Sequence, residues 1–194
     1  MVQKGGFAMG APLPKRLFTV EEYHLMAQAG VLSEDERVEL VEGQVVLMTP
    51  IGSRHAACVK RLNRLFSARA GAKALVGVQD PVRLGAYSEP QPDVALLKPR
   101  ADFYASAHPG PEDVLLVVEV AESSAAYDLE VKIPLYARAG IPEVWLVDLD
   151  AGEIRVYREP AAGRYRQAVT VSRGGELAPA ALPEVVLAAD DVLG

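Results

Sequence analysis

The chain has 194 residues, of which 50% are hydrophobic and 24% charged, a balance that supports one compact core and excludes disordered and fibrous classes. Its apolar runs, such as residues 114–118, are far shorter than the roughly 20 residues of a membrane helix, and no signal-peptide pattern is present. We therefore expect a soluble cytoplasmic protein. Because one cysteine, Cys58, and three histidines cannot build a disulfide or a zinc cage, any metal would need oxygen ligands.

The net charge of -6 argues against a protein that coats nucleic acid by bulk electrostatics. One segment nevertheless differs from the rest, since residues 54–73 contain six cations and no acid. We therefore expect residues 54–73 to form a locally basic part of an otherwise acidic protein.

The N-terminal part begins with residues 1–16, which show no hydrophobic periodicity and are expected to form a mobile arm before a single domain at 17–194. A capping box formed by Thr19 and Glu22 predicts a helix at about 20–29.

A β-hairpin follows, with predicted strands at residues 37–40 and 45–48 and a glycine turn between them. Glu39 alternates with Val38 and Leu40, so the simplest interpretation places its carboxylate in solvent.

The next predicted helix runs from Ser53 to about Ala70, because its apolar residues recur at helical spacing. His55 lies on the apolar arc, where a histidine is more often part of the core than catalytic. A second arc carries cations, and a basic face of this kind is usually solvated surface; its members are Arg54, Lys60, Arg61 and Arg64.

The second half alternates strands with one helix. The helix should start after the N-cap candidates Ser123 and Ser124 and end near Ala139. Pro134 should kink this helix or delay its start, because proline has no backbone N–H. A strand, helix and strand over 114–149 predict a right-handed crossover and one parallel strand pair. Strands are predicted at 74–79, 82–84, 93–98, 114–121, 143–149, 153–158 and 165–172, with 183–193 closing the chain.

Two acids stand out against this pattern. Glu119 interrupts a run that is apolar on both faces, and a buried carboxylate needs a nearby cation, a metal or a salt bridge. Asp93 follows a proline at a strand end, where turn chemistry alone explains it. On neighbouring strands the two carboxylates would attract a divalent cation.

Lys132 lies four residues after Asp128, which is compatible with a surface ion pair. It equally allows the ammonium to point over the sheet toward Glu119. The sequence contains no glycine-rich phosphate loop, nucleophile elbow, Cys-x-x-Cys or His-Glu-x-x-His motif.

The ordered segments FTVEEY, RVELVEGQVVLMTP, QPDVALL, VVEVAESS and DLEVKIPLYARAGIPEVWLVDL resemble the PD-(D/E)XK nuclease superfamily, and within it the Uma branch of restriction endonucleases. One position departs from the superfamily pattern, since Ala121 stands where its lysine usually follows the strand glutamate. The resemblance implies that Lys132 on the next helix takes this role.

The resemblance also implies an α/β fold, a restriction-endonuclease-like core whose mixed sheet of four to five strands lies between helices. Its activity would be Mg²⁺- or Mn²⁺-dependent hydrolysis of DNA, in a homodimer. Asp93, Glu119 and the Val120 carbonyl would bind the metal, while Lys132 would orient water or stabilise phosphoryl charge. Glu39 would serve a second metal or its water, His55 would support the site, and the DNA backbone would follow Arg54, Lys60, Arg61 and Arg64.

Two alternatives remain open. The fold could be an inactive module for nucleic-acid binding or assembly, or a hydrolase of a smaller phosphate ester. The enzymatic hypotheses require the Lys132 nitrogen to lie within about a dozen ångström of Asp93 or Glu119, on the order of a Debye length.

Overall fold

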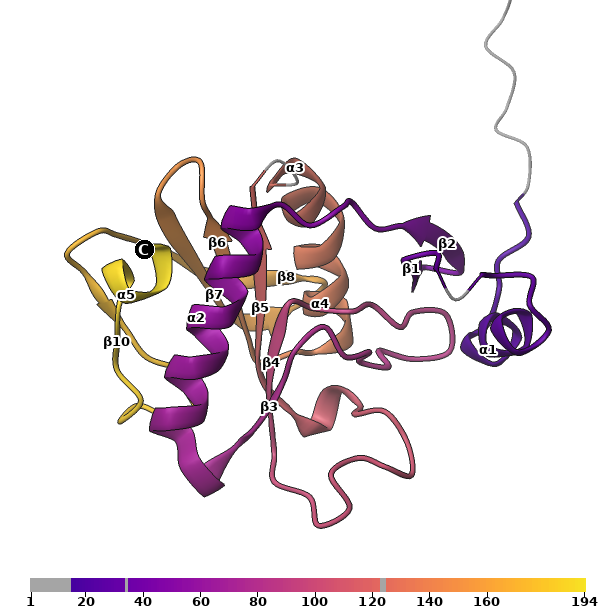
Figure 1. Cartoon of the computed structure of the whole chain (residues 1–194), viewed down its shortest axis with the longest axis horizontal. Coiled ribbons are helices and arrows are strands. Elements are labelled where there is room, and N and C mark those ends of the chain that lie inside the picture. Colours follow the sequence, from indigo (N-terminus) through magenta and orange to yellow (C-terminus); the bar gives the residue numbers. More distant parts are fainter. Residues whose placement is uncertain (1–14, 34, 123–124) are drawn as a thin grey trace, which may run out of the picture.

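The computed structural model describes residues 15–33, 35–122 and 125–194, and its centre is a six-stranded mixed sheet with helices on both faces (Figure 1). Only the β5–β6 pair of this sheet is parallel, as the predicted crossover requires. The strand order along the sheet is β3 (Leu75–Gly77), β4 (Val94–Leu97), β5 (Val114–Ala121), β6 (Glu143–Asp148), β7 (Glu153–Ala161) and β8 (Arg164–Ser172).

The α/β class is confirmed, but the expected four to five strands is wrong. The sheet has six strands because it includes the long hairpin β7–β8, in which β7 pairs with β6.

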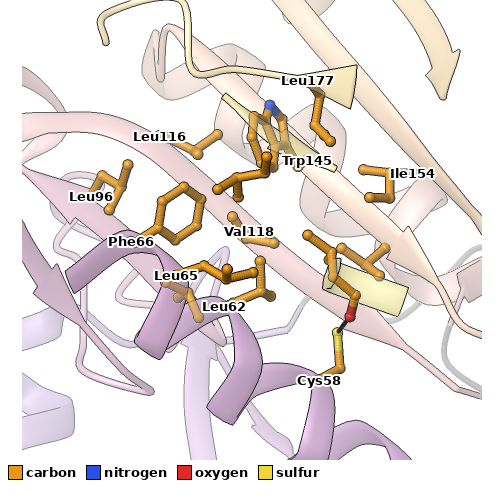
Figure 2. Close-up of a cluster of buried hydrophobic side chains, with 14 of the residues drawn as sticks. Cys58, Leu62, Leu65, Phe66, Leu96, Leu116, Val118, Trp145, Ile154 and Leu177 are labelled. Carbon is orange, nitrogen blue, oxygen red and sulfur yellow. Dashed lines mark hydrogen bonds between the residues drawn. The ribbon is translucent and has the colours of Figure 1, made fainter. Parts of the chain in front are cut away.

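Strand β5 lies in the interior, with Val118 and Val120 packed toward α2 (Ser53–Ala70) in one hydrophobic cluster. Val117 belongs to a second cluster on the opposite face, together with Tyr136 of α4 (Ile133–Ala139). Figure 2 shows the α2 side, where the rings of Phe66 and Trp145 approach to 5.8 Å between centroids. Since side chains alternate along a strand, Glu119 faces the α4 side.

The crossover from β5 to β6 contains α3 (Ala125–Tyr127), a π-helical turn η3 (Asp128–Lys132) and α4. The Ile133 N–H donates to the Asp128 carbonyl, five residues back, and Pro134 has no N–H to continue a regular ladder. The predicted disruption at Pro134 thus takes the form of a wide turn that ends at Lys132. The N-cap candidates Ser123 and Ser124 lie outside the described residues.

The hairpin of β1 (Val38–Val41) and β2 (Gln44–Leu47) lies beside α1 (Val20–Gln28), apart from the large sheet (Figure 1). Residues 86–91 cover β1, through a hydrogen bond from the Glu89 N–H to the Leu40 carbonyl and a contact from the Gln91 N–H to Glu39. Glu39 is therefore only 3% exposed, and the expectation that it faces solvent is wrong.

The predicted strand at 82–84 is also wrong. The Val82 N–H donates to the Pro90 carbonyl and the Leu84 N–H to the Ser88 carbonyl, so this segment folds back within one loop and pairs with no strand of the sheet.

The C-terminal segment returns to α2. The pair β9 (Glu176–Leu177) and β10 (Leu187–Ala188) leads into α5 (Ala189–Leu193), which packs beside α2. The 3₁₀ turn η1 (Gly71–Lys73) connects α2 to β3, and the 3₁₀ turn η2 (Pro111–Asp113) lies between β4 and β5. Within the described ranges, no helix is long and apolar enough to cross a membrane.

Candidate active site

A cavity of about 440 Å³ lies at the end of β5, between the β1–β2 hairpin, the start of α2 and the π turn. Its lining is rich in acids, which outnumber the permanent cations and leave surplus negative charge. The ionisable groups are Glu39, Asp93, Glu119, Glu122 and Asp128 against Arg37 and Lys132, with His55 beside them.

Asp93 and Glu119 meet because β4 and β5 pair antiparallel. The register places Val94 opposite Val118, so the next position brings Asp93 to Glu119. The Val120 N–H donates to Asp93 Oδ2 at 2.9 Å, which holds the carboxylate at the end of β5. The predicted neighbourhood of these strands is confirmed.

Lys132 reaches the same point from the π turn. Its Nζ lies 3.2 Å from Oε2 of Glu39 and 3.2 Å from Oε1 of Glu119, and its side chain is 7% exposed. The Lys132 nitrogen therefore lies well within the dozen ångström of Glu119 that the enzymatic hypotheses require. The interpretation of Lys132 and Asp128 as a surface ion pair is wrong, because both side chains are buried.

The charges of this cluster depend on one another. Burial raises the pKa of Glu119 to about 8, although the attraction of Lys132 acts in the opposite direction. Burial alone would lower the pKa of Lys132, but the carboxylates of Glu119 and Glu39 outweigh it and raise that pKa. Lys132 thus remains an ammonium, and an added cation would favour the charged form of Glu119.

His55 extends from the first turn of α2 and contacts Asp93, with 3.0 Å between Nε2 and Oδ2. This hydrogen bond is the main reason that the pKa of His55 is raised. The apolar arc of α2 thus brings His55 to the cavity.

Two contributors escaped the sequence analysis. The Gln79 side-chain amide donates to Asp93 Oδ1 at 3.2 Å, from a residue with a left-handed backbone (φ 57°) and no sequence signal. The Tyr136 hydroxyl donates to Glu119 Oε1 at 2.6 Å. Tyr136 follows Lys132 by four residues, so helical spacing places both side chains on one stripe, and this pattern is visible in the sequence.

The four α2 cations do not form one surface. Arg61 donates to the Val192 and Leu193 carbonyls and so anchors α5, while Arg54 pairs with Asp150. Lys60 and Arg64 are exposed on α2.

The oxygen donors fit a divalent cation that keeps several waters. In the described parts of the chain, no group of three or more His, Cys, Asp or Glu is placed to hold an ion alone. Asp93, Glu119 and the Val120 carbonyl could supply hard oxygen ligands beside surplus negative charge, a donor set that would suit Mg²⁺ with its preference for few protein ligands. Restriction-endonuclease-like families generally use divalent metals.

Comparisons with known proteins agree with this architecture. The family model Uma2, described as "Putative restriction endonuclease", matches residues 20–190. The structure is similar to a crystal structure titled as a "putative nuclease belonging to DUF820" from Anabaena variabilis, with a TM-score of 0.69 and 16% identity over 91% of this chain and 97% of that one. A search among curated proteins found no match. The chain belongs to the Uma2 family, and its fold is that of a restriction-endonuclease-like nuclease.

Proposed function

We propose that this protein is a divalent-metal-dependent nuclease that hydrolyses phosphodiester bonds of DNA. The observation that carries the proposal is the convergence of Asp93, Glu119 and Lys132 in one cavity, with the Lys132 nitrogen 3.2 Å from the Glu119 carboxylate. Membership of the Uma2 family supports the same reaction class.

Asp93, Glu119 and the Val120 carbonyl would hold Mg²⁺ or Mn²⁺. When bound, such an ion supplies Lewis acidity and neutralises phosphate charge. The hydrogen bonds from His55 and Gln79 orient the Asp93 carboxylate, so these two residues act by positioning a ligand.

Lys132 would contact the scissile phosphate. Because its pKa is raised, it stays protonated and can stabilise negative charge that develops on a phosphoryl oxygen, or orient the attacking water. Glu39 and Glu119 hold the ammonium from two sides, so the Lys132 side chain is already ordered before a substrate binds. Glu39 would also serve a second ion.

Exposed Lys60 and Arg64 would guide the DNA backbone. Arg54, which pairs with Glu122 of the cavity lining, would assist them, and Arg61 would contribute only indirectly by anchoring α5. A homodimer would allow both strands of a site to be cut.

The test is cleavage of a plasmid and of labelled oligonucleotides with Mg²⁺ or Mn²⁺, comparing the wild type with Glu119→Ala and Lys132→Ala. Glu176→Ala and Lys98→Ala are matched controls, since both residues are exposed away from the cavity. We expect activity in the wild type and controls, and a loss of at least about 100-fold in the two cavity variants. Equal cleavage by all five proteins would refute the assignment.

Titration calorimetry distinguishes the inactive-module alternative. A catalytic site should take up Mn²⁺ in a manner that depends on Asp93 and Glu119, whereas a structural remnant should show no such uptake. A panel of small phosphate esters tests the third interpretation.

A further inference from the structure

The cations around the cavity differ in whether an acid already holds them. Lys132 Nζ lies 3.2 Å from carboxylate oxygens of two glutamates, and Arg54 pairs with Glu122 of the lining. The other permanent cation of the lining is Arg37, whose guanidinium makes no hydrogen bond or ion pair with any residue in the described ranges. Arg37 therefore brings a positive charge to the cavity that the protein itself does not balance.

The β1–β2 hairpin directs the Arg37 side chain toward the cavity. The Met48 N–H donates to the Arg37 carbonyl at 2.8 Å. The ladder in which Glu39 lies opposite Val46 thus continues for one more pair. Because side chains alternate along a strand, Arg37 shares a face with Glu39, which contacts Lys132 inside the cavity. The cross-strand neighbours Met48 and Val46 also line the cavity, as this placement requires.

Arg37 and Glu39 lie at different depths on that shared face. Glu39 is 3% exposed, whereas Arg37 is exposed and so lies at the mouth of the cavity. Two residues of a strand span about 7 Å, a separation comparable to that between consecutive phosphates of a nucleic-acid strand. When one phosphate lies at Lys132, the next one along the strand would therefore be within reach of the long Arg37 side chain.

The charge of the lining gives Arg37 a specific role. Acids already outnumber permanent cations there, so each phosphate that enters adds to an excess of negative charge. A divalent ion at Asp93 and Glu119 would neutralise the scissile phosphate but not its neighbour. A guanidinium stays charged at every accessible pH, and its planar fork matches two phosphate oxygens at once.

We propose that Arg37 binds the phosphate next to the scissile one and so favours phosphodiesters that lie within a polynucleotide chain. This inference rests on the proposed nuclease function and assigns a substrate-binding residue to the same site. Each strand of a duplex carries such neighbouring phosphates, so the role applies to both strands. A small phosphate ester without a second phosphate gains nothing from Arg37.

Cleavage kinetics with Mn²⁺ compare the wild type with Arg37→Ala, Arg37→Lys and Arg166→Ala. Arg166 is the matched control, because it is an exposed arginine outside the lining and has no ion pair in the described ranges. Arg37→Ala should raise the KM for DNA at least about tenfold with kcat changed less than about threefold, since a charge-assisted contact is lost. Arg37→Lys, which keeps the charge but not the fork, should lie between the two. Equal KM values for Arg37→Ala and Arg166→Ala overturn the inference while the nuclease function stands.

Substituted oligonucleotides identify the phosphate itself. One oligonucleotide has a single phosphodiester among neutral methylphosphonate linkages, and a second has two consecutive phosphodiesters in the same sequence. The wild type should prefer the second at least about tenfold in kcat/KM. Arg37→Ala should reduce this preference to about the twofold that two cleavable bonds give by themselves. A preference that survives in Arg37→Ala places the neighbouring phosphate elsewhere and overturns the inference.

Fluorescence anisotropy with Ca²⁺ in place of Mn²⁺ measures DNA binding without turnover. Arg37→Ala should weaken binding and lower the salt slope by about one, as expected for one lost phosphate contact. Its melting temperature should equal that of the wild type, because Arg37 holds no other described residue. Binding that depends on Arg37 without any cleavage means that the nuclease proposal alone fails. Wild-type affinity and salt slope in Arg37→Ala overturn the inference whether or not DNA is cut.

Discussion

The Lys132 ammonium lies 3.2 Å from Oε1 of Glu119, at a point where both side chains are almost completely buried. Removing one partner of a buried pair leaves an uncompensated charge, so such pairs are sensitive to single substitutions. In the proposed nuclease the same geometry would place a cation beside the scissile phosphate, so stability and the proposed activity would depend on the same contact.

Lys132→Met should lower the free energy of unfolding by about 3–5 kcal/mol at pH 8, because Glu39 and Glu119 would lose the charge between them. Urea denaturation measures the change. The control Lys98→Met, at an exposed position, should stay within about 0.5 kcal/mol. A loss of less than about 1 kcal/mol in Lys132→Met would contradict the ion pair.

Stability should fall as the pH rises from about 4.5 to about 8. The folded protein holds a proton on Glu119 more tightly than the unfolded chain does, since burial raises its pKa from 4.5 to about 8. This contribution is complete below the unfolded pKa and lost on passing the folded one, with a slope of up to about 1.4 kcal/mol per pH unit. Denaturation of Glu119→Gln across this range should show a flatter profile, and identical profiles would argue against the shift.

Tyr136→Phe should shift Mn²⁺ binding to higher pH. The Tyr136 hydroxyl donates to Glu119 and lowers its pKa, so its removal makes the carboxylate harder to ionise and delays its use as a ligand. Calorimetric titrations at several pH values measure this midpoint. Tyr165→Phe is the control, because its hydroxyl donates to the Ile141 carbonyl away from the cavity. An equal shift in both variants would point to general destabilisation.

Mn²⁺ should raise the melting temperature of the wild type and have little effect on Asp93→Asn. A ligand that binds only the folded state stabilises it by about 2.7 kcal/mol at 100 times its Kd. Thermal unfolding with and without the ion tests this, and Asp150→Asn, at an exposed acid, serves as the control. A similar rise in Asp93→Asn would remove that residue from the ligand set.

The cations of α2 should separate into two classes. Arg61→Ala should destabilise the protein by about 1–3 kcal/mol, because it removes the donors to the Val192 and Leu193 carbonyls. Lys60→Ala and Arg64→Ala should leave stability unchanged and weaken DNA binding, with the salt slope reduced by about one per lost phosphate contact. Binding isotherms at several salt concentrations, beside urea denaturation, distinguish the classes.

Local patterns were sufficient for most of the architecture. The helix at 53–70 followed from apolar spacing, and strand β5 from a run that is apolar on both faces, because burial and helical or strand period leave a direct trace in the sequence. The prediction of a strand at 82–84 was wrong, because a short apolar run does not reveal whether a partner strand exists.

By itself, the sequence determined which residues carry unusual chemistry: a carboxylate within a buried strand, an acid after a proline, and a lysine on the next helix. Only the tertiary structure decided how they meet. The loop at 86–91 turns Glu39 inward, the left-handed Gln79 holds Asp93, and the π turn before Pro134 delivers Lys132 to both acids. These contacts join residues distant along the chain, and no local propensity encodes a distance between elements that only packing brings together.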